Sequence, residues 1–480
     1  MIEIKRRSLI ETKPLEYDFG TNEDKKNRLE AAGQTVKDIS DEDADYQTGE
    51  VGKYPLVYID GVQVENENIK YLKIFNDAMY PSIEIEFSDP TSHLIDENYP
   101  LDDSIVSVYK KSTSKGFMDI KMDFKIMDFK TIKGTSANTI SLKLTGILNI
   151  DDLFLCKFES YKDTSYNVLD NMTNLMKLGF ASNITDTNDS MTWINPAYFK
   201  HEFIRDIVNH SYLDDTTFLF GYIDFYYNFN YVDIEKQINS DISTQMTIND
   251  TESVLKDDKE EPIPLILSNN EDKADTTLYI EKYTVINKST EINVEYGYRY
   301  RFTSYNISED KINKYLLDSI SESGPNGIIL KGNPDNNTLY NESIRGHWMG
   351  KLDNDNVHKN YLHSSLQNTN NLKFLQKLKI SIKMKKPNYG LYRFQKVLVE
   401  LYNFGKPDNE EEVYGKRPEN IEDEGQYDNK IINKLSGEWL ITAINFTFST
   451  KEGNVQELTL VKRELTDVYN FPRRESKNKK

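Results

Sequence analysis

The sequence of 480 residues predicts a mainly β fold of the α+β class, in which two sets of antiparallel strands flank one α+β module. Three observations predict this fold. Stretches with alternating apolar and polar residues recur in two separate parts of the chain, two helical patterns lie between them, and 31 tyrosines and 22 phenylalanines supply much of the apolar content. Alternation with a period of two is typical of half-buried strands, and aromatic residues are enriched there.

The first 150 residues divide into a polar arm and a β domain. Residues 1–50 carry a cluster of acidic side chains at 38–50, so we expect an arm that wraps a neighbour or stays mobile. Residues 51–150 predict the first antiparallel β domain, with five or more strands. The dipeptide Asp60-Gly61 predicts a tight hairpin turn, and the alternation places three residues on one face of a later strand: Ile83, Ile85 and Phe87.

Residues 151–255 predict the α+β module, which opens with a helix over residues 165–178. Thr164 or Ser165 can cap the first amides of this helix, and Gly179 can end it. Its apolar face consists of Val168, Leu169, Met172, Leu175 and Met176. The chain length gives a prior of roughly three domains, which agrees with this division.

A second helix is predicted after Asn195 and Pro196, which suit the N-cap and first helical positions. Strands with alternating aromatic residues should follow it. These residues are Phe218, Phe220 and Tyr222, then Phe225, Tyr227, Phe229 and Tyr231. Two helices packed on an aromatic sheet are therefore expected.

Residues 256–470 predict the second β domain, because the alternating pattern returns there. Polar insertions interrupt it at about 311–370 and 405–435, and a hairpin with a turn at residues 451–454 closes it. The basic tail at 471–480 is expected to be disordered. Two β regions of similar strand content could have arisen by duplication.

Composition limits the function. The formal net charge of −19 and the pI near 4.9 argue against nucleic-acid binding, which depends on neutralising phosphates with Lys and Arg. The single cysteine, Cys156, cannot form an internal disulfide, and its apolar neighbours predict a buried side chain. We expect synthesis in a cytoplasm, because no signal peptide and no membrane-spanning run are apparent.

The sequence offers few candidates for chemistry. Phosphate-binding loops, nucleophile elbows and the motifs HExxH and CxxC are absent, the acidic loops lack the EF-hand pattern, and the six histidines are scattered. We therefore expect no cofactor and no metal. Pairs of carboxylates could hydrolyse glycosides, but strand or helix positions favour a structural role for each one considered: Glu84, Glu86, Glu202 and Asp224.

The order of features resembles the central baseplate hub proteins of contractile-tailed, myovirus-type phages, which are related to the spike trimers of type VI secretion. The resemblance lies in SLKLTGILNI, FESYKDTSYNVLDNMTNLMKLGFASN, DSMTWINPAYFKHEFIRDIV, GYIDFYYNFNYVDI and VQELTLVKREL. It covers about residues 55–310 and 435–466. The arm and the two insertions depart from the pattern of the family.

This resemblance implies a homotrimer in which each chain contributes two tube-like antiparallel β-barrel domains to a pseudo-sixfold ring. The helix at 165–178 would then buttress subunit packing. Such a hub belongs to the tail baseplate of the virion and joins the tail tube protein to the central spike protein. The baseplate wedge proteins and the tape-measure protein are further expected partners, and DNA would pass through the channel without specific binding or membrane insertion.

We therefore expect a structural protein and not an enzyme. A tail-associated enzyme that degrades cell wall or capsule, and a carbohydrate-binding adhesin, are the alternatives. Large aromatic residues often dominate interfaces, so seven are candidates for subunit contacts, with packing inside the domain as the other interpretation. They are Trp193, Phe218, Phe220, Tyr222, Phe225, Tyr227 and Trp439.

Overall fold

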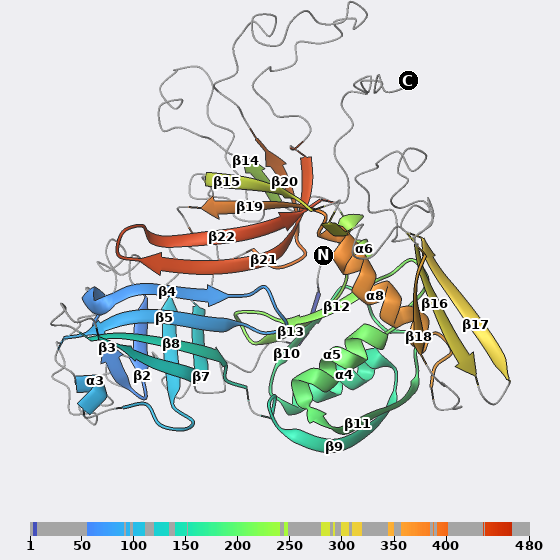
Figure 1. Cartoon of the computed structure of the whole chain (residues 1–480), viewed down its shortest axis with the longest axis horizontal. Helices are drawn as coiled ribbons and strands as arrows, with labels where there is room; N and C mark the ends of the chain where they lie inside the picture. Colours follow the sequence, from blue (N-terminus) through green and yellow to red (C-terminus); the bar gives the residue numbers. More distant parts are fainter. Residues whose placement is uncertain are drawn as a thin grey trace, which may run out of the picture.

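A computed structural model of the chain describes residues 3–6, most of 55–247, parts of 280–401, residue 435 and residues 437–462. It confirms a mainly β fold with few helices (Figure 1). Most of the predicted arm, nearly all of the insertion at about 405–435 and the basic tail lie outside the described residues.

The first strand set follows the predicted alternation. The residues Ile83, Ile85 and Phe87 are buried, and the turn at Asp60 and Gly61 has φ values of 47° and 86° that suit a type I′ hairpin. A short 3-10 helix η2 (Asn66–Asn68) and helix α3 (His93–Asp96) accompany the strands. The strands are β2 (Leu56–Ile59), β3 (Val62–Val64), β4 (Ile69–Phe75), β5 (Ser82–Asp89), β6 (Ile105–Lys110), β7 (Ile120–Ile132) and β8 (Ile140–Leu148).

The second strand set ends in the predicted long hairpin, and Gly453 with φ of 71° opens its last strand. The strands are β14 (Thr244–Thr247), β15 (Ile280–Asn287), β19 (Leu378–Met384), β20 (Lys396–Glu400), β21 (Gly437–Ser449) and β22 (Gly453–Val461). A separate three-stranded sheet contains β16 (Arg299–Asn306), β17 (Lys311–Asp318) and β18 (Ile344–Met349).

The two sets share one sheet. Strand β21 pairs antiparallel with β4, and the main path runs β15-β19-β22-β21-β4-β5-β8-β7-β6-β2-β3. The sheet is open, so the described strands do not form the two barrels that the resemblance implied. The reason is that the outer strand β4 of the first set pairs with the second set and does not close on its own set.

The α+β module lies beside this sheet (Figure 1). Its four-stranded sheet has the order β1-β10-β13-β12, and β9 and β11 form a separate antiparallel ribbon. The module also holds helices α4 (Ser165–Leu175), α5 (Lys200–His210) and α6 (Ile234–Ile238), and helix α8 (Tyr361–Leu375) packs on α5. The strands are β1 (Glu3–Arg6), β9 (Cys156–Asp163), β10 (Gly179–Ser182), β11 (Met191–Phe199), β12 (Leu219–Ile223) and β13 (Asn228–Asp233).

Of the two residues predicted as caps of helix α4, Thr164 takes the N-cap position, and its side chain accepts the Asn167 N–H at 3.4 Å. The predicted end of the helix at Gly179 is wrong. The left-handed residue is Lys177, with φ of 59°, and the following N–H of Leu178 donates to the Thr173 carbonyl at 2.9 Å. This hydrogen-bond pattern closes the helix two residues early, so Gly179 begins strand β10.

Helix α5 begins later than predicted. Asn195 and Pro196 lie in strand β11, and the helix starts at Lys200. The Asn195 side chain instead accepts the N–H of Tyr198 at 2.8 Å, which forms a local turn. This competing turn explains why a typical N-cap sequence does not start the helix.

Candidate assembly surfaces

Six of the seven aromatic residues predicted to contact a neighbouring subunit are buried within the single chain, and Phe220 is only partly exposed. None of the six exposes more than 5% of its surface: Trp193, Phe218, Tyr222, Phe225, Tyr227 and Trp439. A side chain with no accessible surface cannot contact a second chain directly. The other interpretation that the sequence left open, packing inside the chain, therefore describes these residues.

Phe225 and Tyr227 lie in the turn between β12 and β13, and not in an alternating strand as predicted. The Asp224 carboxylate holds this turn by accepting the N–H groups of Tyr226 at 2.8 Å and Asn228 at 2.9 Å. Tyr227 adopts a left-handed backbone with φ of 59°. The turn therefore directs both aromatic rings out of the module.

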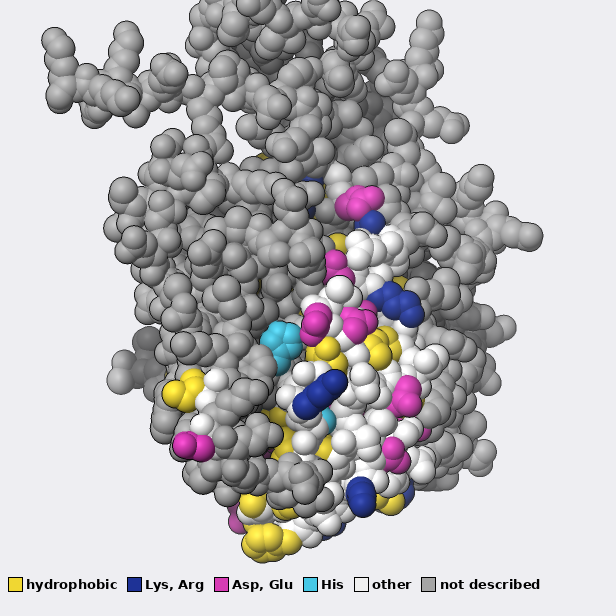
Figure 2. Space-filling view, turned by 90° about the vertical axis from the view of Figure 1, so that its right-hand side faces the viewer, with side chains coloured by type: hydrophobic (Ala, Val, Ile, Leu, Met, Phe, Trp, Pro, Cys, Tyr) yellow, Lys and Arg dark blue, Asp and Glu magenta, His cyan; other side chains and the backbone are white. Residues whose placement is uncertain are grey.

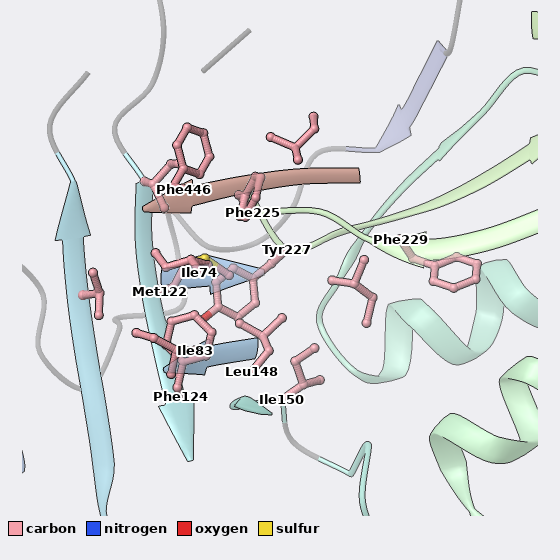
Figure 3. Packing of buried hydrophobic residues seen from close by; sticks show 14 of the residues in the cluster. Ile74, Ile83, Met122, Phe124, Leu148, Ile150, Phe225, Tyr227, Phe229 and Phe446 are labelled. Atoms are coloured by element: carbon pink, nitrogen blue, oxygen red, sulfur yellow. The ribbon is translucent and has the colours of Figure 1, made fainter. Parts of the chain in front are cut away.

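These two rings fasten the module to both strand sets. The Tyr227 ring lies among the core residues of the first set (Figure 3), and its hydroxyl accepts the backbone N–H of Asp123 at 3.0 Å. Phe225 packs against Phe446 of β21, with ring centroids 5.0 Å apart. Burial and the nearby charge of Asp123 raise the pKa of Tyr227, so its hydroxyl stays neutral at physiological pH.

The buried guanidinium of Arg393 makes a second joint, by which we mean a contact that connects the loop after β4 to β21. It donates to the carbonyl oxygens of Thr442 at 2.6 Å, Ala78 at 2.5 Å and Asp77 at 3.2 Å. Burial lowers its pKa to about 10, which leaves it charged at neutral pH. The guanidinium carbon also lies near three aromatic rings, at 5.3 Å from Phe220, 4.7 Å from Tyr222 and 5.6 Å from Phe394.

The two tryptophans on the predicted list also act within the chain. Trp193 Nε1 donates to the Asp163 carbonyl at 3.0 Å, and Trp439 Nε1 donates to the Leu435 carbonyl at 2.9 Å. Each indole is buried and has its polar atom satisfied. Both residues are therefore local anchors of a strand.

The outer face of the β9–β11 ribbon exposes a different apolar group. In the ribbon, Phe158 lies opposite Pro196 and Ile194 lies opposite Ser160, so these side chains share one face. The opposite face is covered, since Trp193 is buried there. We call the exposed apolar side chains of the ribbon, together with Leu155 directly before β9, the ribbon surface, and they are Leu155, Phe158, Ile194, Tyr198 and Phe199.

A second exposed apolar group lies at the far end of β7. Strand β6 pairs with β7 only from residue 120 to residue 125, so the remainder of β7 has β8 as its one paired neighbour among the described strands. The Phe129 ring of this segment contacts the Tyr99 ring, with centroids 5.4 Å apart. We call the exposed side chains of this group the β7 surface, and they are Tyr99, Leu101, Met127 and Ile132, while Phe129 is partly buried against the core.

The two surfaces account for most exposed apolar side chains of the described residues. Twelve large hydrophobic side chains are exposed there, of which five belong to the ribbon surface and four to the β7 surface. Figure 2 shows hydrophobic side chains at the lower end of one face, where the ribbon lies in Figure 1, and mostly polar and charged groups above them. Apolar groups gathered in this way often mark contact sites.

Cys156 is exposed at the start of the ribbon, so the prediction of a buried cysteine is wrong. It lies two residues before Phe158 and on the same outer face. Its apolar sequence neighbours suggested burial, but two of them, Leu155 and Phe158, are themselves exposed.

The four carboxylates weighed as catalytic candidates each contact another group of the chain. Two form ion pairs and two accept backbone N–H groups. The contacts join Glu84 to Lys143 at 2.6 Å, Glu86 to Lys70 at 3.7 Å, Glu202 to the N–H of Phe199 at 3.3 Å and Asp224 to the N–H of Asn228 at 2.9 Å.

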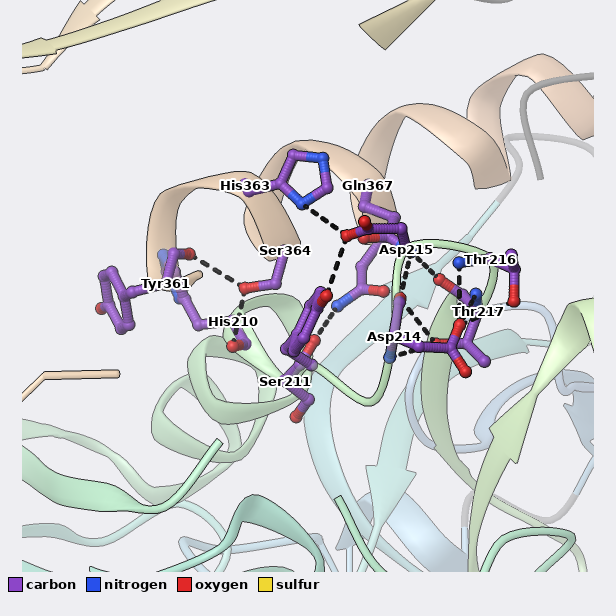
Figure 4. A network of polar contacts seen from close by, with 12 residues as sticks. His210, Ser211, Asp214, Asp215, Thr216, Thr217, Tyr361, His363, Ser364 and Gln367 are labelled. Carbon is purple, nitrogen blue, oxygen red and sulfur yellow. Dashed lines mark hydrogen bonds and ion pairs between the residues drawn. The ribbon is translucent and has the colours of Figure 1, made fainter. Parts of the chain in front are cut away.

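The sequence did not predict the polar contact between α5 and α8, to which three of the six histidines contribute. Figure 4 shows two of them, His210 and His363. The His210 ring stacks on Tyr361 with centroids 3.9 Å apart, and its carbonyl accepts from His358 Nε2 at 2.9 Å. His363 Nδ1 lies 3.8 Å from Asp215 Oδ1. Burial lowers the pKa of His358 and His363, so both favour the neutral form. These contacts attach α8, which begins within the predicted insertion, to the module.

Two further observations concern the described part of the chain. No helix there is long and apolar enough to cross a membrane. No group of three or more His, Cys, Asp or Glu side chains is placed there to share a metal ion.

Comparison with known proteins found similarity among solved structures. No family model matches the chain, and no curated protein matches it. A tail protein from Neisseria meningitidis MC58 is similar with a TM-score of 0.47 and 12% identity, over 85% of this chain and 96% of that one. A 43 kDa tail protein of prophage MuSo2 from Shewanella oneidensis has a TM-score of 0.46 and 10% identity, over 85% and 98%.

An Escherichia coli component of the type VI secretion system, described as structurally similar to T4 bacteriophage tail proteins gp27 and gp5, has a TM-score of 0.41 and 8% identity. The match covers 87% of this chain and 80% of that one. These similar structures are thus two tail proteins, one of them from a prophage, and one component of a type VI secretion system.

Proposed function

We propose that the chain is a structural component of a phage tail and forms the central baseplate hub as a homotrimer. The observation that carries the proposal is the shared sheet, in which β21 pairs with β4. Each chain thereby places two strand sets side by side in one layer. Three such chains arranged around an axis would supply six sets, as a pseudo-sixfold ring below a tail tube requires.

The joints inside the chain support this function. Tyr227 and Phe225 connect the module to both strand sets, and Arg393 connects the loop after β4 to β21. These contacts hold the two sets in one orientation relative to the module. A subunit that transmits force between a tube and a spike requires such rigidity.

In this proposal the tail tube protein binds on one side of the ring and the central spike protein on the other. The baseplate wedge proteins and the tape-measure protein are the further partners, and the channel lets DNA pass. The net charge of −19 favours passage without adhesion, because like charges repel. We also propose that the chain is not an enzyme, which is supported by the structural partners of the four candidate carboxylates.

The test is negative-stain imaging of the purified chain, alone and mixed with the central spike protein of the same tail. We expect ring-shaped particles with threefold symmetry and an open centre. Compact monomers under both conditions would contradict the hub. Release of reducing sugar from peptidoglycan by the same preparation, abolished by one Asp or Glu substitution, would favour the enzyme in its place.

A further inference from the structure

We infer that the far end of strand β7 in one copy pairs antiparallel with strand β15 of the next copy, and that this strand pairing closes the ring. The inference rests on the proposed homotrimer and assigns its subunit contact. A second copy of this chain is the occupant of both strand edges. The basis is a contact of the same kind that already exists inside each chain, between β21 and β4.

The two strand sets repeat one pattern of pairing. The first set has the order β4-β5-β8-β7, and the second has the order β15-β19-β22-β21. All neighbouring strands within both runs are antiparallel. Strands β6 and β20 also occupy corresponding places, because each pairs with the first half of the long strand at the end of its set. Strand β4 therefore corresponds to β15, and β7 corresponds to β21.

Irregularities of the two ladders fall at corresponding positions. The register shifts at the start of both β4 and β15, directly after Ile69 and Ile280. It shifts again within β7 after Ile126 and within β21 after Ile441. Because a bulge is a specific feature of one place in a ladder, these two coincidences match the sets residue by residue.

One of two corresponding contacts is made inside the chain and the other is not. The end of β21 pairs with β4, from Phe446 opposite Ile74 to Ser449 opposite Tyr71. The corresponding strands β7 and β15 lie at the two ends of the run β15-β19-β22-β21-β4-β5-β8-β7 (Figure 1). Among the described strands, β15 pairs only with β19, and residues 127–132 of β7 pair only with β8. Strand edges of this kind can accept a strand from another chain.

The internal contact also gives the register of the proposed one. Lys73 lies opposite Thr447 in the chain. Lys73 and Thr284 each lie four residues after the isoleucine that precedes the first shift, and Thr447 and Ile132 each lie six residues after the isoleucine that precedes the second. Thr284 of one copy should therefore lie opposite Ile132 of the next.

The exposure of the two edges agrees with burial in this contact. Ile132 is 51% exposed on β7, and Ile286 is 39% exposed on β15. Thr447, the counterpart of Ile132 in the contact that is made inside the chain, is only 7% exposed. Pairing with a neighbouring strand thus covers this position in the second set, and the same pairing would cover it in the first.

The charges of the two strands are compatible with this register. Lys130 would lie opposite Ile286 and Lys133 opposite Tyr283, so neither lysine directly faces another lysine. Lys130 Nζ keeps its ion pair with Asp128 Oδ2 on its own strand, at 2.6 Å. The proposed contact therefore depends on backbone pairing and apolar side chains, and not on attraction between charges.

Repetition of the internal contact between copies produces a ring. Neighbouring strands of the run alternate in direction, so β7 of one copy and β15 of the next are antiparallel, as β21 and β4 are. Each set then follows the previous set in the same manner, both within a chain and between chains. Three copies supply six sets, and head-to-tail contacts of this kind form closed rings when the rotation permits.

The experiment traps the contact with a disulfide. Ile132→Cys and Thr284→Cys are combined in one chain, in which Cys156→Ser removes the exposed native thiol. Within one chain these two positions have β19, β22, β21, β4, β5 and β8 between them, so a disulfide between them joins two chains. Lys130→Cys with Ile286→Cys gives the same test at the next position of this type. Circular dichroism shows whether each variant is folded.

The chosen position suits a disulfide. Asn76 and Ile444 exchange two backbone hydrogen bonds at 3.1 Å and 3.2 Å, so Lys73 and Thr447, three residues along, form a pair without such bonds. Cα atoms of such pairs lie about 4.5 Å apart, within the range that a disulfide spans. Lys73→Cys with Thr447→Cys is therefore the matched internal control, which should form its disulfide inside one chain.

A second control tests the register. Ile132→Cys with Val285→Cys moves one thiol by a single residue, which places it on the opposite face of the sheet. After mild oxidation, we expect Ile132→Cys with Thr284→Cys to give covalent dimers and trimers on a non-reducing gel. Reduction should return them to single chains of 55.9 kDa, and the Val285→Cys control should remain as single chains throughout.

Light scattering of the same folded samples separates the contact from the proposed function. Particles of three chain masses that form no disulfide between chains at either pair would overturn the contact and leave the trimer standing. Equal cross-linking in the Val285→Cys control would overturn the register. A parent chain that stays monomeric, both alone and mixed with the central spike protein, would contradict the proposed homotrimer and the contact with it.

Discussion

The β12–β13 turn and the β9–β11 ribbon belong to the same module and carry similar aromatic side chains, but the structure uses them in opposite ways. Tyr227 of the turn is 4% exposed, whereas Phe158 of the ribbon is 84% exposed. The turn inserts its rings into the neighbouring strand sets, and the outer face of the ribbon meets no other element among the described residues. Aromatic content alone therefore does not identify an assembly surface.

The difference has a local cause. The Asp224 carboxylate and the left-handed backbone of Tyr227 turn the chain sharply, so the rings leave the module and reach a second core. The ribbon is a two-stranded sheet with helix α5 on one side, and its other side has no layer to cover it. Four predictions test the comparison, beginning with the largest effect.

The first prediction is that Tyr227→Ala lowers the free energy of unfolding by about 4 kcal/mol, because it leaves a cavity in a packed core. Tyr227→Phe keeps the ring and removes only the hydroxyl that accepts the Asp123 N–H, so it should lose about 1 kcal/mol. Urea denaturation at one fixed protein concentration measures both. Equal losses in the two variants would show that the ring itself contributes little.

The second prediction concerns Arg393, the other joint of the module. Arg393→Met removes the donor from three carbonyl oxygens and the cation from the adjacent rings, so we expect a loss of about 3 kcal/mol. The same denaturation assay measures it. A variant as stable as the parent chain would contradict the role of Arg393 in fastening the strand sets.

The third prediction uses a second buried cation, Lys110, which lies near the contact between Phe225 and Phe446. The Lys110 Nζ has no hydrogen-bond partner and lies 5.1 Å from the centre of the Phe446 ring. Because this ammonium is desolvated and only the ring offsets part of the cost, Lys110→Met should stabilise the chain by about 1–4 kcal/mol at pH 6. The expected sign is opposite to that of Arg393→Met, because the Arg393 guanidinium has hydrogen-bond acceptors and the Lys110 ammonium has none.

This third effect depends on pH in a defined direction. Burial lowers the pKa of Lys110 to about 7 from its ordinary 10.5. Below pH 7 the side chain is charged in both the folded and unfolded states, so the full destabilisation applies. Between pH 7 and 10.5 the unfolded state binds the additional proton, and the free energy of unfolding rises with pH. Denaturation from pH 6 to 9 should show this rise in the parent chain and a smaller one in Lys110→Met.

Local features of the fold were predictable from the sequence. The turn at Asp60 and Gly61, the alternation of Ile83, Ile85 and Phe87, and the cap at Thr164 each depend on a few neighbouring residues. The pairing of β21 with β4 was not predictable, because it joins strands about 370 residues apart and no local pattern specifies a partner. The open, shared sheet follows from this pairing.

The candidate site was predictable only in part. Seven aromatic residues were predicted as candidates for subunit contacts, but six of them are buried inside the chain. Asp224 before two tyrosines and Asn228 was a usable turn signal, since Asp side chains often accept nearby backbone N–H groups. The exposure of Phe158 could not be read from alternation, because that pattern says which residues share a face and not whether another layer covers it.

The fourth prediction has the smallest expected effect on the free energy of unfolding, and it compares the ribbon with the turn directly. Phe158→Ala should change the free energy of unfolding of the monomer by no more than about 0.5 kcal/mol, because the ring already lies in water. The measurement uses dilute protein, at a concentration where the parent chain is monomeric, so that assembly does not add stability. If Phe158→Ala instead destabilised the monomer as much as Tyr227→Ala, Phe158 would be a core residue and the distinction between a buried joint and an exposed surface would fail.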